Sequence, residues 1–410
     1  MMGKPKIRFK GYNEDWEQRK LGEIAPLRGG YAFQSNNFLE EGIPIVKISN
    51  ILSTGEVAGE FSFYEELDND TNFILPDKAA VLAMSGATTG KVSILSNPSN
   101  IKFYQNQRVG YFKKTDGINY PFISTLVRSQ VFNNQLNSIL VTGAQPNVSS
   151  KDIDDFDVLI PTSYKEQKKI GAYFSNLDHL ITLHQHKCDE MKKLKKYMLQ
   201  KMFPKNGKKV PEIRFDGFTN DWEQRKFSEL VMIERGGSPR PIDKYITKAE
   251  NGLNWVKIGD APEQSNYITK TSEKIIPEGL SKTREVHPGD LILSNSMSFG
   301  RPYIMAIDGC IHDGWLAIRD TEKRFDLKFL CTLLGTDSML NQYKAMAAGS
   351  TVNNLNKELV GSTIVSFPKM DEQTKIGEYF TNLDHLNTLH QHKCDELQNF
   401  KKYMLQNMFV

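Results

Sequence analysis

Two glycine-containing loops carry the hydroxyl and basic side chains that could hold a phosphate. Residues 85–93 read SGATTGKVS, and residues 295–301 read NSMSFGR. A Walker phosphate loop has the form G-x-x-x-x-G-K-S/T, so that main-chain amides surround the phosphates and the hydroxyl meets magnesium. In the first loop the glycines are one residue too close and Val92 follows Lys91, while the second offers arginine and proline at these positions. The spacing therefore argues against nucleotide binding.

The same loops have the composition expected at a DNA surface. Glycines at 86, 90 and 300 would let the main chain approach a ligand, and a basic side chain at each loop end would meet phosphates or guanine. The alternative is that each loop is a plain turn that ends a strand. The residues expected to contact DNA here are Ser85, Thr88, Thr89, Lys91, Asn295, Ser298 and Arg301.

Two more pairs of segments carry side chains that can recognise base edges. LRGGYAFQS (27–35) corresponds to ERGGSPRP (234–241), and YQNQR (104–108) corresponds to IHDGW (311–315). Arginine can donate two hydrogen bonds to guanine, and Asn or Gln amides can pair with adenine. Solvated turns and edge-strand hydrogen bonding are the alternatives. The expected DNA contacts are Arg28, Gly29, Tyr31, Asn106, Gln107, Arg108, Arg235, Ser238, Arg240, His312 and Trp315, and their different types predict different bases in the two halves.

A third pair of segments, TGAQPN (142–147) and GSTVNN (349–354), is rich in amides and hydroxyls. These segments could contact DNA or cap local structure, and the sequence favours neither. The lysines of 192–201 could follow phosphates, although a solvated helix face explains them too. The residues assigned to DNA from this group are Gln145, Thr351 and Asn353.

HQHKC occurs twice, at 184–188 and 390–394, and its histidine and cysteine side chains suggest a metal site. On a helix, however, His184 and Cys188 share one face while His186 points elsewhere. Two ligands on one helix would need two more from outside. Core packing is therefore favoured, and no metal site is predicted.

These segments belong to a chain that is built twice. Residues 176–203 and 382–409 agree at 22 of 28 positions with an offset of 206, and residues 7–25 return as 213–231 at the same offset. The central segments match at an offset of 210, so the middle of each half gains and loses residues. One scaffold is therefore expected to carry two different central surfaces.

The pattern of each half predicts an α+β fold with two pseudo-symmetric recognition domains and two long helices. The expected boundaries are a first domain at 1–164, a helix at 165–203, a linker at 204–212, a second domain at 213–370 and a helix at 371–410. A capping box is expected from the S-x-x-E spacing of Ser163 and Glu166, and Asp371 could cap the second helix. Short runs rich in β-forming residues predict strands at 43–48, 79–84, 109–113, 157–160, 290–294 and 314–319, and mixed helical stretches are expected at 120–140 and 325–346.

Each long helix has a heptad seam and a wider apolar face. Antiparallel pairing of the two would give a rod of roughly 55–60 Å, long enough to hold two DNA-reading domains ~34–36 Å apart. A second stripe at Tyr173, Leu180, Leu194 and Tyr197 predicts a further protein partner, although an internal hairpin without a partner is the alternative. The residues expected in the coiled coil or at the partner are Phe174, Leu177, Leu180, Ile181, Met191, Met198, Phe380, Leu383, Leu386, Leu397 and Met404.

The composition is typical of a protein of two domains outside the membrane. The chain has 410 residues, of which 39% are hydrophobic and 25% charged. No run of about 18 apolar residues could cross a membrane, and the basic N-terminus lacks the apolar segment of a secretion signal. The four cysteines form no C-x-x-C pair, so reduced thiols and a cytoplasmic location are expected. A net charge of +3 is compatible with DNA but does not require it.

The repeated boundaries carry a resemblance to a known family. IPTSYKEQKKIGAYFSNLD (160–178) and SFPKMDEQTKIGEYFTNLD (366–384) each join a proline-ended strand to an EQ-x-KI helix start and an NLD segment. The two halves open with DWEQRKLGEIA and DWEQRKFSELV. Over essentially its whole length, the chain resembles the DNA specificity subunit of type I restriction–modification systems.

The resemblance implies a chain without catalytic activity. Each domain would read one half of a split, asymmetric site in double-stranded DNA, and the helices would set the spacing and dock two methyltransferase subunits. Those subunits would bind S-adenosylmethionine, and two restriction subunits would use ATP and Mg, so this chain would bind no cofactor itself. The sequence has no Asn/Asp-Pro-Pro-Tyr/Phe motif of the kind that holds a flipped adenine. From the residues alone, a stand-alone two-domain DNA-binding regulator is the alternative.

Overall fold

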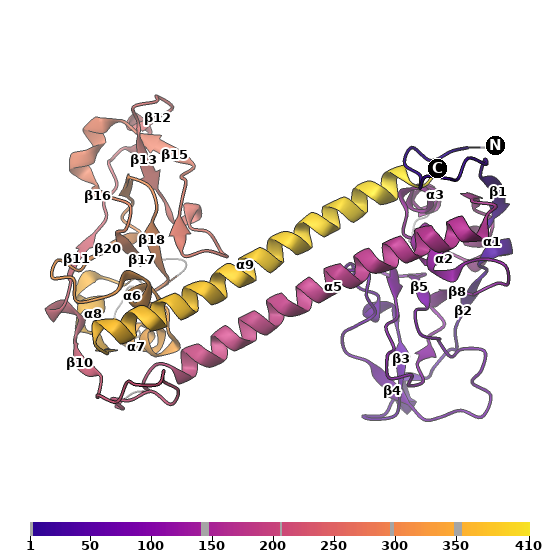
Figure 1. Cartoon of the computed structure of the whole chain (residues 1–410), viewed down its shortest axis with the longest axis horizontal. Helices are drawn as coiled ribbons and strands as arrows, with labels where there is room; N and C mark the ends of the chain where they lie inside the picture. Colours follow the sequence, from indigo (N-terminus) through magenta and orange to yellow (C-terminus); the bar gives the residue numbers. More distant parts are fainter. Residues whose placement is uncertain (1–2, 141–146, 206, 296–298, 348–354) are drawn as a thin grey trace. The chain divides into compact units, whose positions relative to one another are not determined.

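The chain divides into two compact units, and each long helix contributes to both of them (Figure 1). The computed structural model describes residues 3–140, 147–205, 207–295, 299–347 and 355–410. Unit 1 comprises residues 1–183 and 393–410, and unit 2 comprises residues 184–392. Each unit therefore holds the first part of one long helix and the last part of the other.

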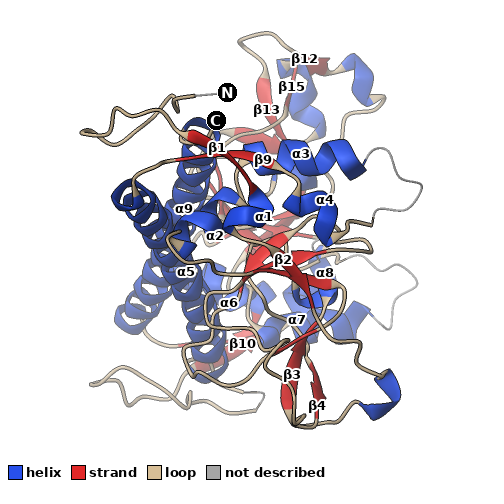
Figure 2. Cartoon of the chain, turned by 90° about the vertical axis from the view of Figure 1, so that its right-hand side faces the viewer, coloured by secondary structure: helices blue, strands red, loops and turns tan. Residues whose placement is uncertain are grey.

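Unit 1 is a mixed β structure with short helices. Its main sheet has the antiparallel order β2-β8-β5-β6, and a smaller sheet has the order β4-β3-β7, in which β3 and β7 are parallel. Strands β1 and β9 form a separate pair, which Figure 2 shows apart from β3 and β4. The strands are β1 (Glu17–Lys20), β2 (Leu27–Gly29), β3 (Ile43–Val46), β4 (Ser62–Tyr64), β5 (Ala80–Ala83), β6 (Val92–Ile94), β7 (Tyr104–Gln105), β8 (Val109–Phe112) and β9 (Asp157–Ile160). The helices are α1 (Leu21–Ile24), α2 (Tyr120–Leu126), α3 (Gln130–Leu140), α4 (Ser150–Asp154) and the long α5 (Tyr164–Lys201).

Unit 2 repeats this plan with additional strands. Its sheets have the orders β11-β20-β17-β18-β14 and β12-β15-β13-β19-β16, and β10 pairs with β21. The strands are β10 (Glu223–Lys226), β11 (Met232–Arg235), β12 (Ile246–Thr247), β13 (Leu253–Val256), β14 (Tyr267–Ile268), β15 (Glu273–Ile275), β16 (Arg284–Val286), β17 (Leu291–Ser294), β18 (Pro302–Met305), β19 (Gly309–Ile311), β20 (Trp315–Arg319) and β21 (Ile364–Phe367). The helices are α6 (Leu327–Leu334), α7 (Asp337–Ala347), α8 (Lys357–Ser362) and the long α9 (Met370–Asn407).

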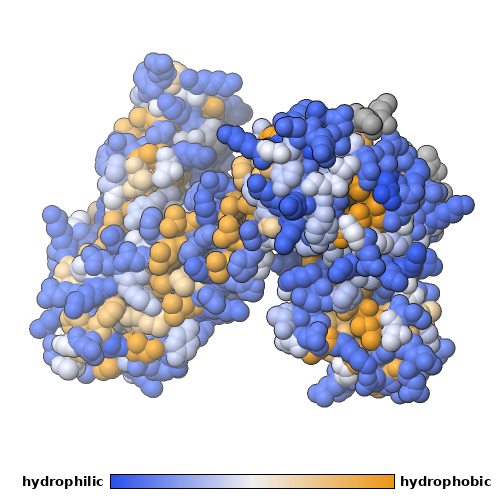
Figure 3. Space-filling view, turned by 45° about the vertical axis from the view of Figure 1, so that its right-hand side comes forward, coloured by the Kyte–Doolittle hydropathy of each residue, from blue (hydrophilic) through white to orange (hydrophobic). Residues whose placement is uncertain are grey.

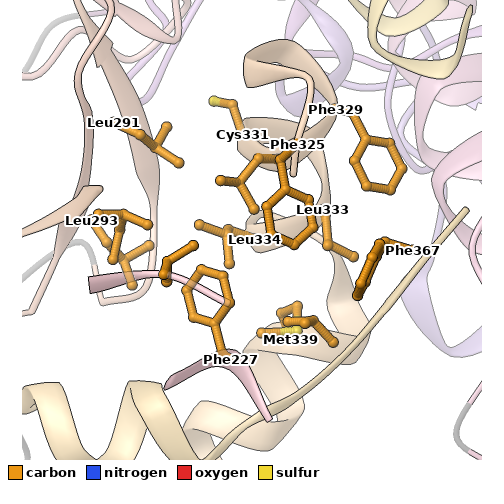
Figure 4. Packing of buried hydrophobic residues seen from close by; sticks show 14 of the residues in the cluster. Phe227, Leu291, Leu293, Phe325, Phe329, Cys331, Leu333, Leu334, Met339 and Phe367 are labelled. Atoms are coloured by element: carbon orange, nitrogen blue, oxygen red, sulfur yellow. The ribbon is translucent and has the colours of Figure 1, made fainter. Parts of the chain in front are cut away.

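The core of each unit forms where apolar strand faces meet the short helices. In unit 2, Phe227, Leu291 and Phe329 belong to one buried cluster, part of which Figure 4 shows. The corresponding cluster of unit 1 contains Trp16 and Phe122. Fully burying such a side chain contributes about 1.5–3 kcal/mol, so these apolar runs decide which face of each strand turns inward.

An aromatic residue just beyond the end of each long helix completes the core of a unit. In unit 1 the ring of Phe409 lies 6.1 Å from that of Trp16, and in unit 2 the ring of Phe203 lies 5.9 Å from that of Trp222. Each tryptophan is 1% exposed. The core of each unit is therefore built partly by the helix that starts in the other half of the repeat.

Within each unit the two long helices run antiparallel. In unit 2, His184 faces His390 and Lys195 forms an ion pair with Asp384 at 2.6 Å. Residue numbers therefore increase along α5 in the direction in which they decrease along α9. In unit 1, Lys401 makes the equivalent ion pair with the aspartate at the matching position of α5. The expected fold class, α+β with two long helices paired antiparallel, is confirmed.

A buried arginine–glutamate pair anchors the start of each long helix. Arg8 donates two hydrogen bonds to Glu166, at 2.7 and 2.8 Å, and Arg214 donates two to Glu372, both at 2.7 Å. Both carboxylate oxygens of Glu166 therefore face Arg8, which corrects the expectation of a capping box with Ser163. A second correction concerns the other helix, whose residue 371 lies inside the first turn instead of capping it.

A glycine in each long helix allows a short helix to approach closely. A Cβ atom on Gly171 would lie 2.7 Å from Asn119 Oδ1, and one on Gly377 would lie 2.6 Å from Asp326 Oδ1. Both polar residues cap a short helix, α2 in unit 1 and α6 in unit 2. The G in the repeated K-I-G motif is therefore required by packing.

The expected elements agree closely with the structure. The strands expected from the sequence are β3, β5, β8, β9, β17 and β20, with ends that differ by no more than two residues, and each mixed helical stretch is a pair of helices. The segment 204–212, expected to be a linker, contacts the end of α5 in unit 2, because Glu212 forms ion pairs with Lys201 and Lys205.

Candidate nucleic-acid interface

Three loops of unit 1 converge on one surface, which we call loop surface 1. The main chain of Tyr31 is hydrogen-bonded to Gln105 at 2.9 Å and to Gln107 at 2.8 Å. The amide of Met84 donates to the carbonyl of Arg108 at 3.0 Å. Loop surface 1 consists of residues 28–31, 84–91 and 105–108. The fold thus brings together three segments that lie far apart in the sequence.

Loop surface 1 presents several side chains to solvent. Arg28, Tyr31, Lys91, Gln107 and Arg108 are all exposed. Among the residues that the structure describes, the side chains of the last three form no hydrogen bond or ion pair. A free guanidinium beside a free amide offers the donors and acceptors that pair with guanine and adenine in the major groove.

Other polar side chains of this surface stabilise the loops themselves. Thr88 donates its hydroxyl proton to the carbonyl of Ile48 at 3.1 Å, and Thr89 donates to that of Gly86 at 2.6 Å. The side-chain oxygen of Asn106 accepts a main-chain hydrogen bond at 3.3 Å. Each of these groups already forms a hydrogen bond within the protein, but its oxygen can still accept another one. The other residues expected on this surface, Gly29 and Ser85, are exposed and half-buried respectively.

The exposed ring of Tyr31 rests on an aromatic cluster. Tyr31 is 44% exposed, and its ring stacks on that of Phe73 with centroids 4.8 Å apart. Phe33 contacts the same ring edge-on at 4.9 Å. A ring held on two others loses little freedom when a base or sugar packs against it.

The corresponding loops of unit 2 gather around Asp313, and we call them loop surface 2. The carboxylate of Asp313 accepts a hydrogen bond from Ser238 at 2.8 Å and lies 3.0 Å from Nε2 of His312. Its main-chain carbonyl accepts hydrogen bonds from Asn295 at 2.9 Å and Arg235 at 3.3 Å. Loop surface 2 consists of residues 235–240, 294–295, 299–301 and 311–315.

Asp313 is held in its charged form. Partial burial opposes ionisation, but the hydrogen bond from Ser238 and the charges of His312, Arg235 and Arg240 outweigh it and keep the pKa of Asp313 below its ordinary value. The guanidinium of Arg240 lies 3.7 Å from the carboxylate. Loop surface 2 therefore combines an acceptor with adjacent cations. A carboxylate at a base edge accepts from the amino group of cytosine.

Strand register shows which loop residues are equivalent in the two units. Val109 begins β8 and Trp315 begins β20, and both pair with the end of the central strand of their sheet. Asp313 therefore stands where Gln107 stands in unit 1. The expected DNA contact at Trp315 is corrected, because this side chain is 0% exposed and packs in the core.

Two more residues of unit 2 mainly support the loops. Asn295 is 2% exposed and is bound through its main chain to Gly314 and Leu355 at 2.9 and 3.1 Å. Its burial removes it from the set that could read a base. Arg301 donates to the carbonyl of Glu263 at 2.5 Å. The expected contacts Gln145, Ser298, Thr351 and Asn353 lie outside the described residues.

The seam residues of the long helices pack inside the units. Phe174, Leu177, Phe380 and Leu383 are at most 7% exposed and belong to the two cores. They therefore stabilise the core within each unit and are not accessible to a partner. Ile181, Met191, Met198, Leu397 and Met404 are half-buried.

A different set of apolar side chains on these helices is exposed, and we call it the exposed apolar set. Its members are 38–54% exposed and match between the helices at the offset of 206. Figure 3 shows hydrophobic surface interrupting a largely hydrophilic exterior. The set comprises Leu180, Leu183, Leu194 and Tyr197 on α5, and Leu386, Leu389, Phe400 and Tyr403 on α9.

The first histidines of the two HQHKC segments meet within unit 2. Nδ1 of His184 lies 3.0 Å from Nδ1 of His390, and Cys188 is 2% exposed. Within the described ranges, no group of three or more potential metal ligands occurs. The pair packs between the helices.

Comparison with known proteins identifies the family. The family model described as "Type I restriction modification DNA specificity domain" matches residues 13–193 and again residues 219–399. The chain belongs to this family. The two matches are offset by the same 206 residues as the internal repeat. A DNA-recognition role without catalysis follows from this membership, together with DNA and the methyltransferase and restriction subunits as partners.

Curated relatives agree with this assignment. The specificity subunit of the type I restriction enzyme MjaVIII from Methanocaldococcus jannaschii is 28% identical over 96% of this chain and 91% of its own length. The EcoAI specificity subunit from Escherichia coli is 26% identical over 44% of this chain and 30% of its own length.

Solved structures agree on the fold. The S subunit of a type I system from M. genitalium superimposes with a TM-score of 0.68 at 13% identity, covering 100% of this chain and 99% of the other. A chain from a study of type I complex assembly gives 0.53 at 18% identity over 95% and 96%. Among the described residues, no helix is long and apolar enough to cross a membrane.

Proposed function

We propose that each unit of this specificity subunit reads one half of a bipartite, asymmetric DNA site. The observation that carries the proposal is the contrast between loop surfaces 1 and 2. Equivalent strands present Gln107 with Arg108 in one unit and Asp313 with Gly314 in the other. Amide and guanidinium groups favour purine edges, whereas a carboxylate favours an amino-group donor, so the two halves would differ in sequence.

Phosphate contacts would position each unit on the duplex before bases are read. Lys91 is exposed on loop surface 1, and Arg235 and Arg240 are exposed on loop surface 2. Such contacts contribute affinity and register without sequence information. They also make binding fall as salt concentration rises.

The long helices would fix the gap between the half-sites and dock two methyltransferase subunits. The support is the exposed apolar set, whose members repeat at the offset of 206. Two equivalent partner contacts need two equivalent patches, and apolar side chains of this size provide the binding energy when covered. The partners would carry S-adenosylmethionine, ATP and Mg, and this chain would bind none of them. The whole complex would act in the cytoplasm.

The test is to map methylated sites in cells that carry this chain and its methyltransferase. The proposal predicts one split motif with two different halves. Replacing residues 1–160 by the corresponding domain of another family member should change one half and leave the other. A change in both halves would contradict modular reading. Tight binding of a split site without any methyltransferase would instead favour a stand-alone regulator.

A further inference from the structure

Unit 2 contains a pocket that the proposed function does not use. It lies between the last turns of α5 and the junction of α6 with α7, and its volume is about 650 Å³. Leu199, Phe203 and Pro204 give it apolar walls. The cationic lining consists of Lys192, Lys195, Lys196, Lys201 and Lys205. An apolar cavity surrounded by lysines fits a ligand that is both hydrophobic and acidic.

The positive charge of this pocket is only partly neutralised by the chain itself. Lys195 pairs with Asp384, and two further lysines pair with Glu212. Lys192 and Lys196 form no ion pair with any residue that the structure describes. Among the described residues that line the pocket, Asp337 is the one carboxylate. The pocket therefore keeps a surplus of positive charge for an incoming group.

At the position equivalent to Gly335, unit 1 carries an arginine. Ser129 and Thr336 occupy matching positions, because each hydroxyl accepts a hydrogen bond from the main-chain amide three residues later, at 3.4 Å. Arg128 therefore corresponds to Gly335. Arg128 is 13% exposed and bridges to Asp178 at 2.8 Å. Gly335 places no side chain at this position in unit 2, where it lines the pocket.

We propose that this pocket is a docking site for an acidic segment of the methyltransferase subunit, with an apolar side chain between its carboxylates. The inference rests on the proposed function, which brings that subunit to α5. It makes the two docking positions unequal. The segment would insert at unit 2 and would find Arg128 in its way at unit 1.

A protein segment suits the pocket better than a DNA phosphate does. A phosphate needs cations alone and gains nothing from Leu199, Phe203 and Pro204. An amphipathic segment covers those side chains while its carboxylates meet Lys192 and Lys196. Electrostatic complementarity of this kind speeds association and fixes the register of binding.

Gly335→Arg gives unit 2 the side chain that unit 1 carries at the equivalent position, and it tests the proposal. A Cβ atom at Gly335 meets nothing closer than Pro302 Cγ at 3.5 Å, and φ is −87°, so the chain accommodates a side chain there. Titration calorimetry of the full chain with its methyltransferase should show two sites of different affinity. In the variant, the tighter site should weaken about tenfold and approach the other. Thermal unfolding of the variant checks that it folds.

Lys196→Glu with Lys193→Glu as its matched control gives a second measurement. Both residues lie on α5, but only Lys196 lines the pocket. We expect Lys196→Glu to weaken one site, most clearly at low salt, and Lys193→Glu to leave both unchanged.

Three outcomes would overturn the inference. In the first outcome, Gly335→Arg and Lys196→Glu leave both methyltransferase affinities within twofold of those of the unaltered chain, while substitutions in the exposed apolar set abolish binding. The proposed function would then stand, and the pocket would have no part in docking. Lys196→Glu could weaken DNA binding alone, which would make the pocket a phosphate site. The unaltered chain could bind no methyltransferase, and then the proposed function fails as well.

Discussion

The two units share a scaffold and differ in their loops. Arg8 with Glu166 and Arg214 with Glu372 are the same buried pair built twice. Gln107 and Asp313 occupy one position of that scaffold and have different chemistry. The repeat therefore preserves the residues that stabilise each unit and varies the residues that each unit presents to solvent.

The largest effect should come from the shared scaffold. Arg8→Ala would leave Glu166 buried without a partner, and Arg214→Ala would do the same to Glu372. Each should lower the free energy of unfolding by about 3–5 kcal/mol, as measured by urea denaturation. A loss in one unit and none in the other would show that the scaffolds are not equivalent.

Substitutions in the exposed apolar set should have the next largest effect. Leu183→Glu and Leu389→Glu each remove an apolar contact worth about 1.5–3 kcal/mol when covered. We expect weaker methyltransferase binding in calorimetry and an unchanged unfolding temperature of the free chain, because both side chains are exposed. Unchanged binding by both variants would remove the set from the interface.

Asp313→Asn in loop surface 2 and Gln107→Ala in loop surface 1 test whether each surface reads a different half-site. Each should cost about 1–3 kcal/mol of discrimination at a single half-site, and the affected halves should differ. Methylation of DNA in which one half-site is altered at a time measures this. If both substitutions changed the same half, the assignment of one unit to each half would be wrong.

The smallest effect concerns acid stability. Burial opposes ionisation of Asp178, but Arg128 and Lys401 keep its pKa below the ordinary value. A lowered folded pKa stabilises the chain above the unfolded pKa of about 3.9, and this contribution is lost as pH falls through the folded value. Asp178→Asn should therefore flatten the loss of thermal stability below pH 4. An identical acid profile in the variant would contradict this assignment.

Much of the scaffold could be predicted from the sequence because its physics is local. The heptad seam predicted the long helices, and short β-rich runs predicted strands such as β9 to the residue. The buried role of Glu166 could not be predicted, since its partner Arg8 lies 158 positions away. The local spacing of Ser163 and Glu166 suggested a helix cap instead of a buried ion pair.

The loops were harder because their register depends on pairing between strands. The loop from Ala83 to Gly90 is one residue longer than the loop from Ser294 to Gly300, as the matching hydrogen bonds between these ends show. The sequence matched residues 104–108 to 311–315, whereas strand register makes Val109 equivalent to Trp315. This shift of one residue placed Trp315 among the expected DNA contacts and left out Asp313. The signal that could have identified Asp313 as a functional residue was its acidic side chain within a basic, glycine-rich segment.

We propose that the two units are interchangeable scaffolds with different reading loops. A direct test replaces residues 213–369 by a second copy of residues 7–163, which the offset of 206 places in register. Methylation mapping of cells that carry this chain and its methyltransferase should then give a symmetric motif, with the first half-site repeated in inverted orientation. Survival of the original second half-site, despite the loss of loop surface 2, would show that loop surface 2 does not read that half-site.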